Sequence, residues 1–123
     1  MFKKIAFTMY PVTDMDRAKA FYEETLGLPP AKESVTGKWI EFDLPMGGCL
    51  ALTTMAQGVT PGSEAGGSLA FEVDDIHALT ETLKSRGVKF KMELFESPVC
   101  HMAVALDSEG NAFMLHQLKK TAG

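Results

Sequence analysis

The stretch GGSLAFEVDDIHALTETLKSRGV, residues 66–88, repeats a pattern that the chain has already used about sixty residues earlier. At 7–15 and again at 68–76, a short strand-like run ends in Val-x-Asp and leads into an apolar residue that begins a helical pattern. Repeating units of this length are too long for a solenoid. The echo therefore indicates a duplicated half-domain.

Each strand-like run is followed by an amphipathic helix with its own start and stop signals. Asp14 is a plausible N-cap for the first helix, and Asp74 or Asp75 for the second. Gly27 and Gly87 stand where a residue just past a helix end is expected. The apolar positions at helical spacing are Met15, Ala18, Phe21, Tyr22 and Leu26 in the first helix and Ile76, Leu79 and Leu83 in the second.

The remainder of each half reads as a short strand followed by a β-hairpin. The short strands are expected around 31–35 and 88–92, the hairpin strands at 39–44, 49–53, 102–107 and 112–116, and the turns at 45–48 and 108–111. Glycines in both turns can supply the positive φ that a tight hairpin needs. Each half is thus predicted to run strand, helix, strand, strand, strand.

These units predict one α+β domain over residues 1–123. It consists of two βαβββ modules at about 1–54 and 67–118, joined by a linker at 55–66 that is rich in Gly, Thr, Ser and Pro. We expect the modules to pair into a curved mixed sheet with the helices on its convex face. The concave side would form a cup, which is a natural place for a small molecule.

The bulk composition limits the partners of the chain. A net charge of −4 and a pI near 5.3 argue against nucleic acid and against anionic membrane surfaces as partners. The apolar run after the N-terminus stops at Pro11 and Asp14, so neither a signal peptide nor a membrane span is expected there. Two cysteines, Cys49 and Cys100, are too few for a disulfide scaffold and indicate free thiols in a reducing compartment. A cytoplasmic location is expected.

The chain resembles the vicinal oxygen chelate superfamily, which includes glyoxalase I, extradiol dioxygenases, fosfomycin-resistance transferases and bleomycin-resistance proteins. The resemblance covers nearly the whole chain and is carried by residues 12–18 running into 21–28, by residues 70–76, and by Asp-Ser-Glu-Gly-Asn at 107–111. It implies the two-module fold described above and a ligand site in the cup.

In metal-dependent members of that superfamily, the ligands lie on the first and last strands of each module. Carried over to this sequence, those positions are Phe7, Ala51, Ser68 and Met114. A phenyl ring and a methyl group cannot ligate, a hydroxyl is a poor ligand, and a thioether is too soft for the usual ions. We therefore expect neither a metal nor another cofactor.

Period-two alternation extends the inward-facing set beyond those four positions. The candidate ligand-binding residues are Phe7, Met9, Trp39, Thr53, Ser68, Met102 and Met114. The polar inward candidates for acid–base work are Glu41, Glu72 and His116. The opposite phase, expected beneath the helices, comprises Ile40, Phe42, Leu50, Leu52, Leu69, Phe71, Val73, Phe113 and Leu115. His77 is expected to be solvated on its helix, and His101 to face away from Met102.

The leading interpretation is a glyoxalase/bleomycin-resistance-like protein that binds a small, partly apolar organic molecule in a metal-free cup. Three alternatives stay open. The first is a metal-independent lyase or isomerase that uses Glu41, Glu72 or His116 as acid or base. The second is a metal-dependent glyoxalase or dioxygenase with ligands elsewhere, and the third is a dimerising module with a vestigial cup. The sequence does not decide whether the chain is an enzyme. Exposed sheet edges favour association, and a homodimer is expected.

Overall fold

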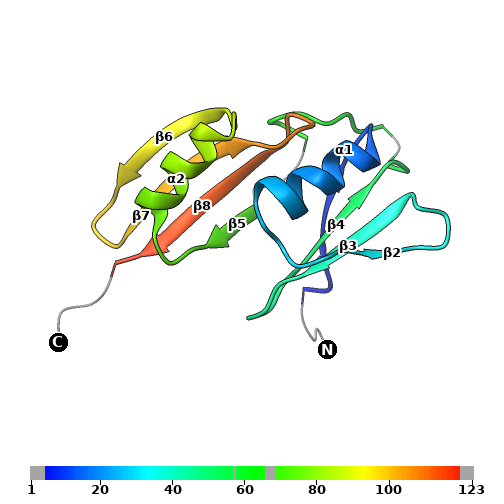
Figure 1. Ribbon diagram of the computed structural model, residues 1–123, viewed down its shortest axis with the longest axis horizontal. Coiled ribbons are helices and arrows are strands. Elements are labelled where there is room, and N and C mark those ends of the chain that lie inside the picture. Colours follow the sequence, from blue (N-terminus) through cyan, green and yellow to red (C-terminus); the bar gives the residue numbers. More distant parts are fainter. Residues whose placement is uncertain (1–4, 57, 66–68, 120–123) are drawn as a thin grey trace.

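The computed structural model describes residues 5–56, 58–65 and 69–119 (Figure 1). The first module contains β1 (Thr8–Pro11), α1 (Met15–Ala20), the π-helical turn η1 (Phe21–Thr25), β2 (Lys32–Glu33), β3 (Trp39–Asp43) and β4 (Cys49–Thr53). The second contains β5 (Leu69–Glu72), α2 (Ile76–Ser85), β6 (Phe90–Glu96), β7 (Cys100–Leu106) and β8 (Ala112–Leu118). Each module therefore has the βαβββ order that the sequence predicts.

The two modules have the same sheet topology. The strand order is β1-β4-β3-β2 in one sheet and β5-β8-β7-β6 in the other. The β1–β4 and β5–β8 pairs are parallel, whereas the other neighbours are antiparallel. The predicted α+β fold with two modules is confirmed. Among the described residues the hydrogen-bond ladders form two separate four-stranded sheets, with β1 and β5 as edge strands.

Both helices lie on the same side of the two sheets, which stand next to each other (Figure 1). α1 contacts β4, and α2 contacts β7 and β8. The opposite faces of both sheets, here called the open face, are covered by no helix of the described residues. None of the described helices is long and apolar enough to cross a membrane.

The helix ends follow the predicted signals. Asp14 accepts a hydrogen bond from the Arg17 N–H at 3.0 Å, and Asp75 accepts one from the Ala78 N–H at 3.1 Å. Gly27, with a φ of 80°, takes the left-handed conformation that ends the first helix. The last turn of that helix widens, and Leu26 donates to the carbonyl of Phe21, five residues earlier. This π-helical turn was not predicted.

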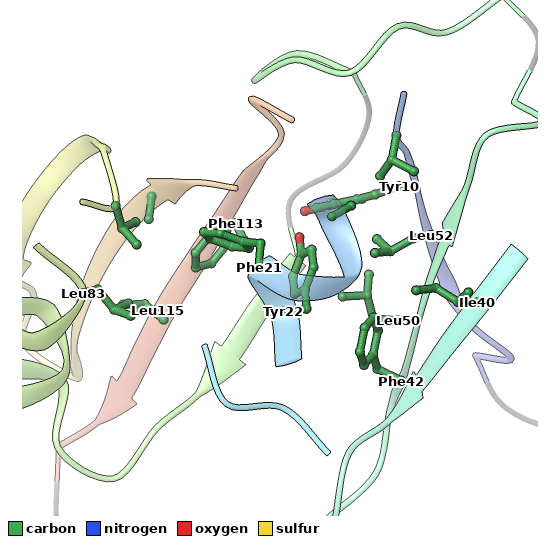
Figure 2. Packing of buried hydrophobic residues seen from close by; sticks show 14 of the residues in the cluster. Tyr10, Phe21, Tyr22, Ile40, Phe42, Leu50, Leu52, Leu83, Phe113 and Leu115 are labelled. Carbon is green, nitrogen blue, oxygen red and sulfur yellow. The ribbon is translucent and has the colours of Figure 1, made fainter. Parts of the chain in front are cut away.

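The π-helical turn places two adjacent aromatic residues in the core between the modules. Phe21 and Tyr22 lie between Phe113 of β8 and the first-module side chains Phe42 and Leu50 (Figure 2). The ring centroids of Phe21 and Phe113 are 6.0 Å apart, and those of Tyr22 and Phe42 are 5.7 Å apart. One hydrophobic cluster thus contains buried residues of both modules.

The turn between β7 and β8 joins the modules through polar contacts. Asp107 accepts a hydrogen bond from the buried Tyr22 hydroxyl at 2.9 Å, and Asn111 donates from Nδ2 to the Pro11 carbonyl at 2.8 Å. Burial raises the pKa of Asp107 in spite of the hydrogen bonds from Tyr22 and the backbone. The segment at 108–111 is a turn, as predicted, and it also anchors the second module to the first.

Several observed strands differ in length from those predicted, among them β2 and β6. β2 has only two residues instead of the five expected at 31–35. β6 extends to Glu96, four residues beyond the expected end at Met92, and its pairing with β7 shifts register twice. At each shift the two strands stop pairing residue for residue. The sheet face on which a β6 side chain lies therefore cannot be inferred from the alternation of β7.

Candidate functional site

Burial separates the two faces of each sheet as the alternation predicts. Six residues of one phase are buried in the core beneath the helices: Ile40, Phe42, Leu50, Leu52, Phe113 and Leu115. Three more residues of this phase pack against that core: Leu69, Phe71 and Val73. The intervening residues therefore point toward the open face. Directly opposed residues share a face, which aligns Met9, Ala51 and Glu41 across the first sheet.

The first module presents an aromatic corner on the open face, formed by Phe7, Trp39 and Glu41. The Phe7 and Trp39 rings meet edge to face, with centroids 5.1 Å apart and planes at 86°. The Trp39 indole Nε1–H donates to Glu41 Oε2 at 2.8 Å, which fixes the ring. Phe7 remains 45% exposed and Met9 42% exposed, so their apolar surface is available from solvent.

Cys49 lies beside the aromatic corner and acts as a weak donor. Its Sγ is 3.8 Å from Glu41 Oε1. Burial, followed by the neighbouring Glu41 carboxylate, raises the pKa of the Cys49 thiol. The thiol is thus kept protonated and is a poor nucleophile.

The second module presents a carboxylate–imidazole pair on the open face. His116 Nδ1 lies 2.6 Å from Glu72 Oε1, and Glu72 Oε2 accepts a hydrogen bond from the Leu118 N–H at 2.9 Å. The Leu118 N–H first, and then the His116 ring, lower the pKa of the Glu72 carboxyl. A neutral His116 that donates Nδ1–H to this carboxylate leaves the Nε2 lone pair free to accept a proton.

Apolar side chains continue the row that starts with this pair. Met102 is opposite His116, and Phe95 of β6 is opposite Met102. Phe95 is 41% exposed and was missed by the sequence analysis, because the predicted strand stopped at Met92. The alternating run at 90–94 was the signal that could have extended the predicted strand toward Phe95.

The other predicted ligand-binding residues occupy different environments. Met114 lies in the middle of the second sheet, opposite Ala70 and Val104. Thr53 is only 1% exposed, and its hydroxyl donates to the Lys38 carbonyl and accepts from the Met55 N–H. Ser68 lies outside the described residues. Glu41 stands on one sheet, and the Glu72–His116 pair stands on the other.

The residues at the expected ligand positions do not fit a divalent metal. Phe7, Ala51 and Met114 offer a phenyl ring, a methyl group and a thioether. In the described part of the chain, no three His, Cys, Asp or Glu side chains converge in a way that could hold an ion. The ring centroids of His77 and His101 are 5.1 Å apart. Both rings lie on the helix side of the second sheet, away from the open face.

Comparison with known proteins agrees with this architecture. The family model described as Glyoxalase/Bleomycin resistance protein/Dioxygenase superfamily matches residues 4–115. YetH, an uncharacterized protein of Bacillus subtilis (strain 168), is 30% identical over an alignment of 121 positions, which covers 95% of this chain and 100% of YetH. The lactoylglutathione lyase of Schizosaccharomyces pombe is 28% identical over an alignment of 134 positions, which covers 86% of this chain but only 44% of that enzyme.

A solved structure shares both the fold and part of the sequence. TnmS3, an antibiotic binding protein from Streptomyces sp. CB03234, superimposes with a TM-score of 0.79 at 28% identity, covering 96% of this chain and 98% of TnmS3. The two-module topology, the family match over residues 4–115 and this likeness agree. The chain belongs to the Glyoxalase/Bleomycin resistance protein/Dioxygenase superfamily.

Proposed function

We propose that the protein binds a small, partly apolar organic molecule on the open face without the help of a metal ion. The observation that carries this proposal is the aromatic corner. There a half-exposed Phe7 and a Trp39 fixed by Glu41 form a rigid apolar wall beside an acceptor group. Apolar walls with a few placed polar groups are the usual composition of small-molecule sites.

The second sheet contributes complementary chemistry. Met102, Met114 and Phe95 supply adaptable apolar contacts, since thioether side chains fit ligands of varied shape. The Glu72–His116 pair supplies a polar anchor. The antibiotic binding described for TnmS3 supports a drug-like or metabolite-like ligand for this chain as well.

A second copy of the chain is the proposed partner on the open face. Three large apolar residues on this face are 41–45% exposed to solvent: Phe7, Met9 and Phe95. Exposed apolar surface of this kind marks interfaces or ligand grooves. A homodimer would cover this surface and enclose the bound molecule. The free thiols Cys49 and Cys100 fit the reducing conditions of the cytoplasm, which is the proposed location.

Trp39 is the only tryptophan of the chain, so its fluorescence reports directly on the aromatic corner. A metabolite and antibiotic library should be screened by thermal shift, since binding to the folded state raises the melting temperature. Hits should change Trp39 emission in a saturable way in protein treated with a chelator. Phe7→Ala should weaken binding roughly tenfold through lost apolar contact. Val35→Ala, at an exposed site elsewhere, should leave binding unchanged.

The Glu72–His116 pair also favours a second function, a metal-independent lyase or isomerase reaction. Its 2.6 Å contact orients the imidazole as a general base would be oriented. Glu72→Gln distinguishes the two functions. Loss of turnover of a bound ligand with retained binding would support catalysis, whereas weaker binding without any turnover in either protein would support sequestration.

A further inference from the structure

A cavity of about 390 Å³ lies where the two modules meet. It is bordered by η1, by the residues that follow α2, and by the end of β7 with the turn after it. None of the candidate residues of the open face lines it. Its volume is within the range of small-molecule sites.

The walls of this junction cavity divide into an apolar and a polar part. Phe21, Val88 and Leu106 provide the apolar part. Arg86, Lys89 and Ser108 provide cationic and hydroxyl groups. Such a lining suits a molecule with an apolar body and an anionic end.

The two cations at the cavity are unusual in this acidic chain because neither forms an ion pair with a carboxylate of the described residues. The described part of the chain contains nine Lys and Arg side chains, and five of these form ion pairs: Arg17, Lys19, Lys32, Lys84 and Lys119. The four without an ion pair among the described residues are Lys38, Arg86, Lys89 and Lys91. Two of those four line the same cavity.

Arg86 is also held in place across the module boundary. Its Nη1 donates to the Thr25 carbonyl at 2.7 Å, which ties the end of α2 to the end of η1. A guanidinium has five N–H donors, so one such bond leaves a fixed group with donors to spare. Asp107 also borders the cavity, but its oxygens already accept hydrogen bonds from Tyr22 and from backbone N–H groups.

We propose that the junction cavity is a second binding site, and that its ligand is a small amphipathic carboxylate. The apolar part of the ligand would pack against Phe21, Val88 and Leu106. The carboxylate would bind the Arg86 guanidinium, and Lys89 would add favourable charge. Because Arg86 and Phe21 belong to different modules, the bound molecule would contact both.

The test uses benzoate as the probe and benzyl alcohol as its uncharged counterpart, in amide NMR titrations at constant ionic strength. Benzoate should give saturable shifts of the amides of Gly87, Val88, Ser108 and Gly110. Benzyl alcohol should bind at least roughly tenfold more weakly, since it lacks the charge-assisted contact. Equal affinity for the two probes, or shifts confined to the open face, would overturn the proposal.

Arg86→Gln should weaken benzoate binding by roughly tenfold or more. Lys91→Gln is the matched control, because it removes the same charge from an unpaired cation outside the cavity. It should change the affinity less than about twofold, as expected for a screened surface charge. Arg86→Lys keeps the charge but not the planar fork, and it should fall between wild type and Arg86→Gln. Equal losses in Arg86→Gln and Lys91→Gln would contradict a specific site.

Discussion

Glu41 illustrates how one residue can have a different role from the one its type suggests. A carboxylate in a cup is a candidate general base, but both of its oxygens are engaged, by the Trp39 indole at 2.8 Å and by the Cys49 thiol at 3.8 Å. It therefore holds an aromatic wall in place. Glu72 similarly orients His116 and is itself held by the Leu118 N–H. Of the three acid–base candidates, His116 is the one with a ring atom, Nε2, that has no hydrogen-bond partner among the described residues.

Glu41→Ala should release the Trp39 indole and change its emission spectrum, because the ring loses its charged acceptor. The loss of this half-buried hydrogen bond should lower the free energy of unfolding by about 1 kcal/mol. Glu64→Ala, in an exposed part of the chain, should leave the emission spectrum unchanged. An unaltered spectrum in Glu41→Ala would show that the indole does not depend on this carboxylate.

At the scale of elements, the turn at 107–111 determines how the modules are joined. Glu109 accepts hydrogen bonds from the Thr13 and Asp14 N–H groups and forms an ion pair with Arg17 at 2.6 Å. Burial alone would raise the pKa of Glu109, but the Arg17 guanidinium and these N–H donors lower it to about 2. The polar side chains of this turn thus have a structural explanation in contacts to the start of the first helix.

This contact predicts how stability depends on pH. Because the pKa of Glu109 is lower in the folded protein than its ordinary value of 4.5, the contribution is fully present above pH 4.5. It is lost as the pH falls from there through about 2. Glu109→Gln should lower the free energy of unfolding at neutral pH by about 1 to 2 kcal/mol, a range that allows for solvent screening at the half-exposed Arg17. When the free energy of unfolding is measured as a function of pH, its decrease below pH 4.5 should be smaller in Glu109→Gln than in wild type. An equally steep decrease in Glu109→Gln would contradict this assignment.

The sequence was sufficient for elements whose signals are local. Asp14 and Asp75 cap their helices, and the facing of β3, β4, β7 and β8 follows strict alternation. The π-helical turn at Phe21–Thr25 is packed between the modules, and the register shifts of β6 arise in its pairing with β7. No local pattern in the sequence records either feature. Phe95 and the Glu72–His116 contact depend on strand pairing within the second module, and the junction cavity depends on the packing of the two modules, so these features emerged only from the tertiary structure.

At the scale of the whole molecule, the two modules share one hydrophobic core. Phe21 and Tyr22 of the first module contact Phe113 of the second, and the Tyr22 hydroxyl reaches Asp107 across the boundary. Neither module can separate without exposing these rings. The repeated halves are therefore expected to behave as one cooperative unit.

Denaturant unfolding should show a single transition when followed by Trp39 fluorescence, which reports on the first module, and by circular dichroism, which reports on both. Phe113→Ala should lower the free energy of unfolding by about 3 to 5 kcal/mol, because it leaves a cavity between the modules. Its transition should stay single. Two separated transitions in either protein would mean that the modules fold independently.

The proposed dimer can be tested by sedimentation equilibrium at micromolar concentration. The expected mass is twice the 13.4 kDa of the chain. Met9→Glu would place a charge on the open face and should shift the equilibrium toward monomer. Met46→Glu, in an exposed turn, is the control and should not shift it. A wild-type mass near that of one chain would exclude the dimer under these conditions.

The most direct test of metal-free binding on the open face is a methionine-methyl NMR spectrum of chelator-treated protein, recorded with and without a ligand found by the thermal-shift screen. The methyl signals of Met9, Met102 and Met114 should shift in a saturable way, while that of Met46 in the exposed turn should stay in place. Binding that appears only after a divalent ion is added, or shifts that spare all three open-face methionines, would contradict the account.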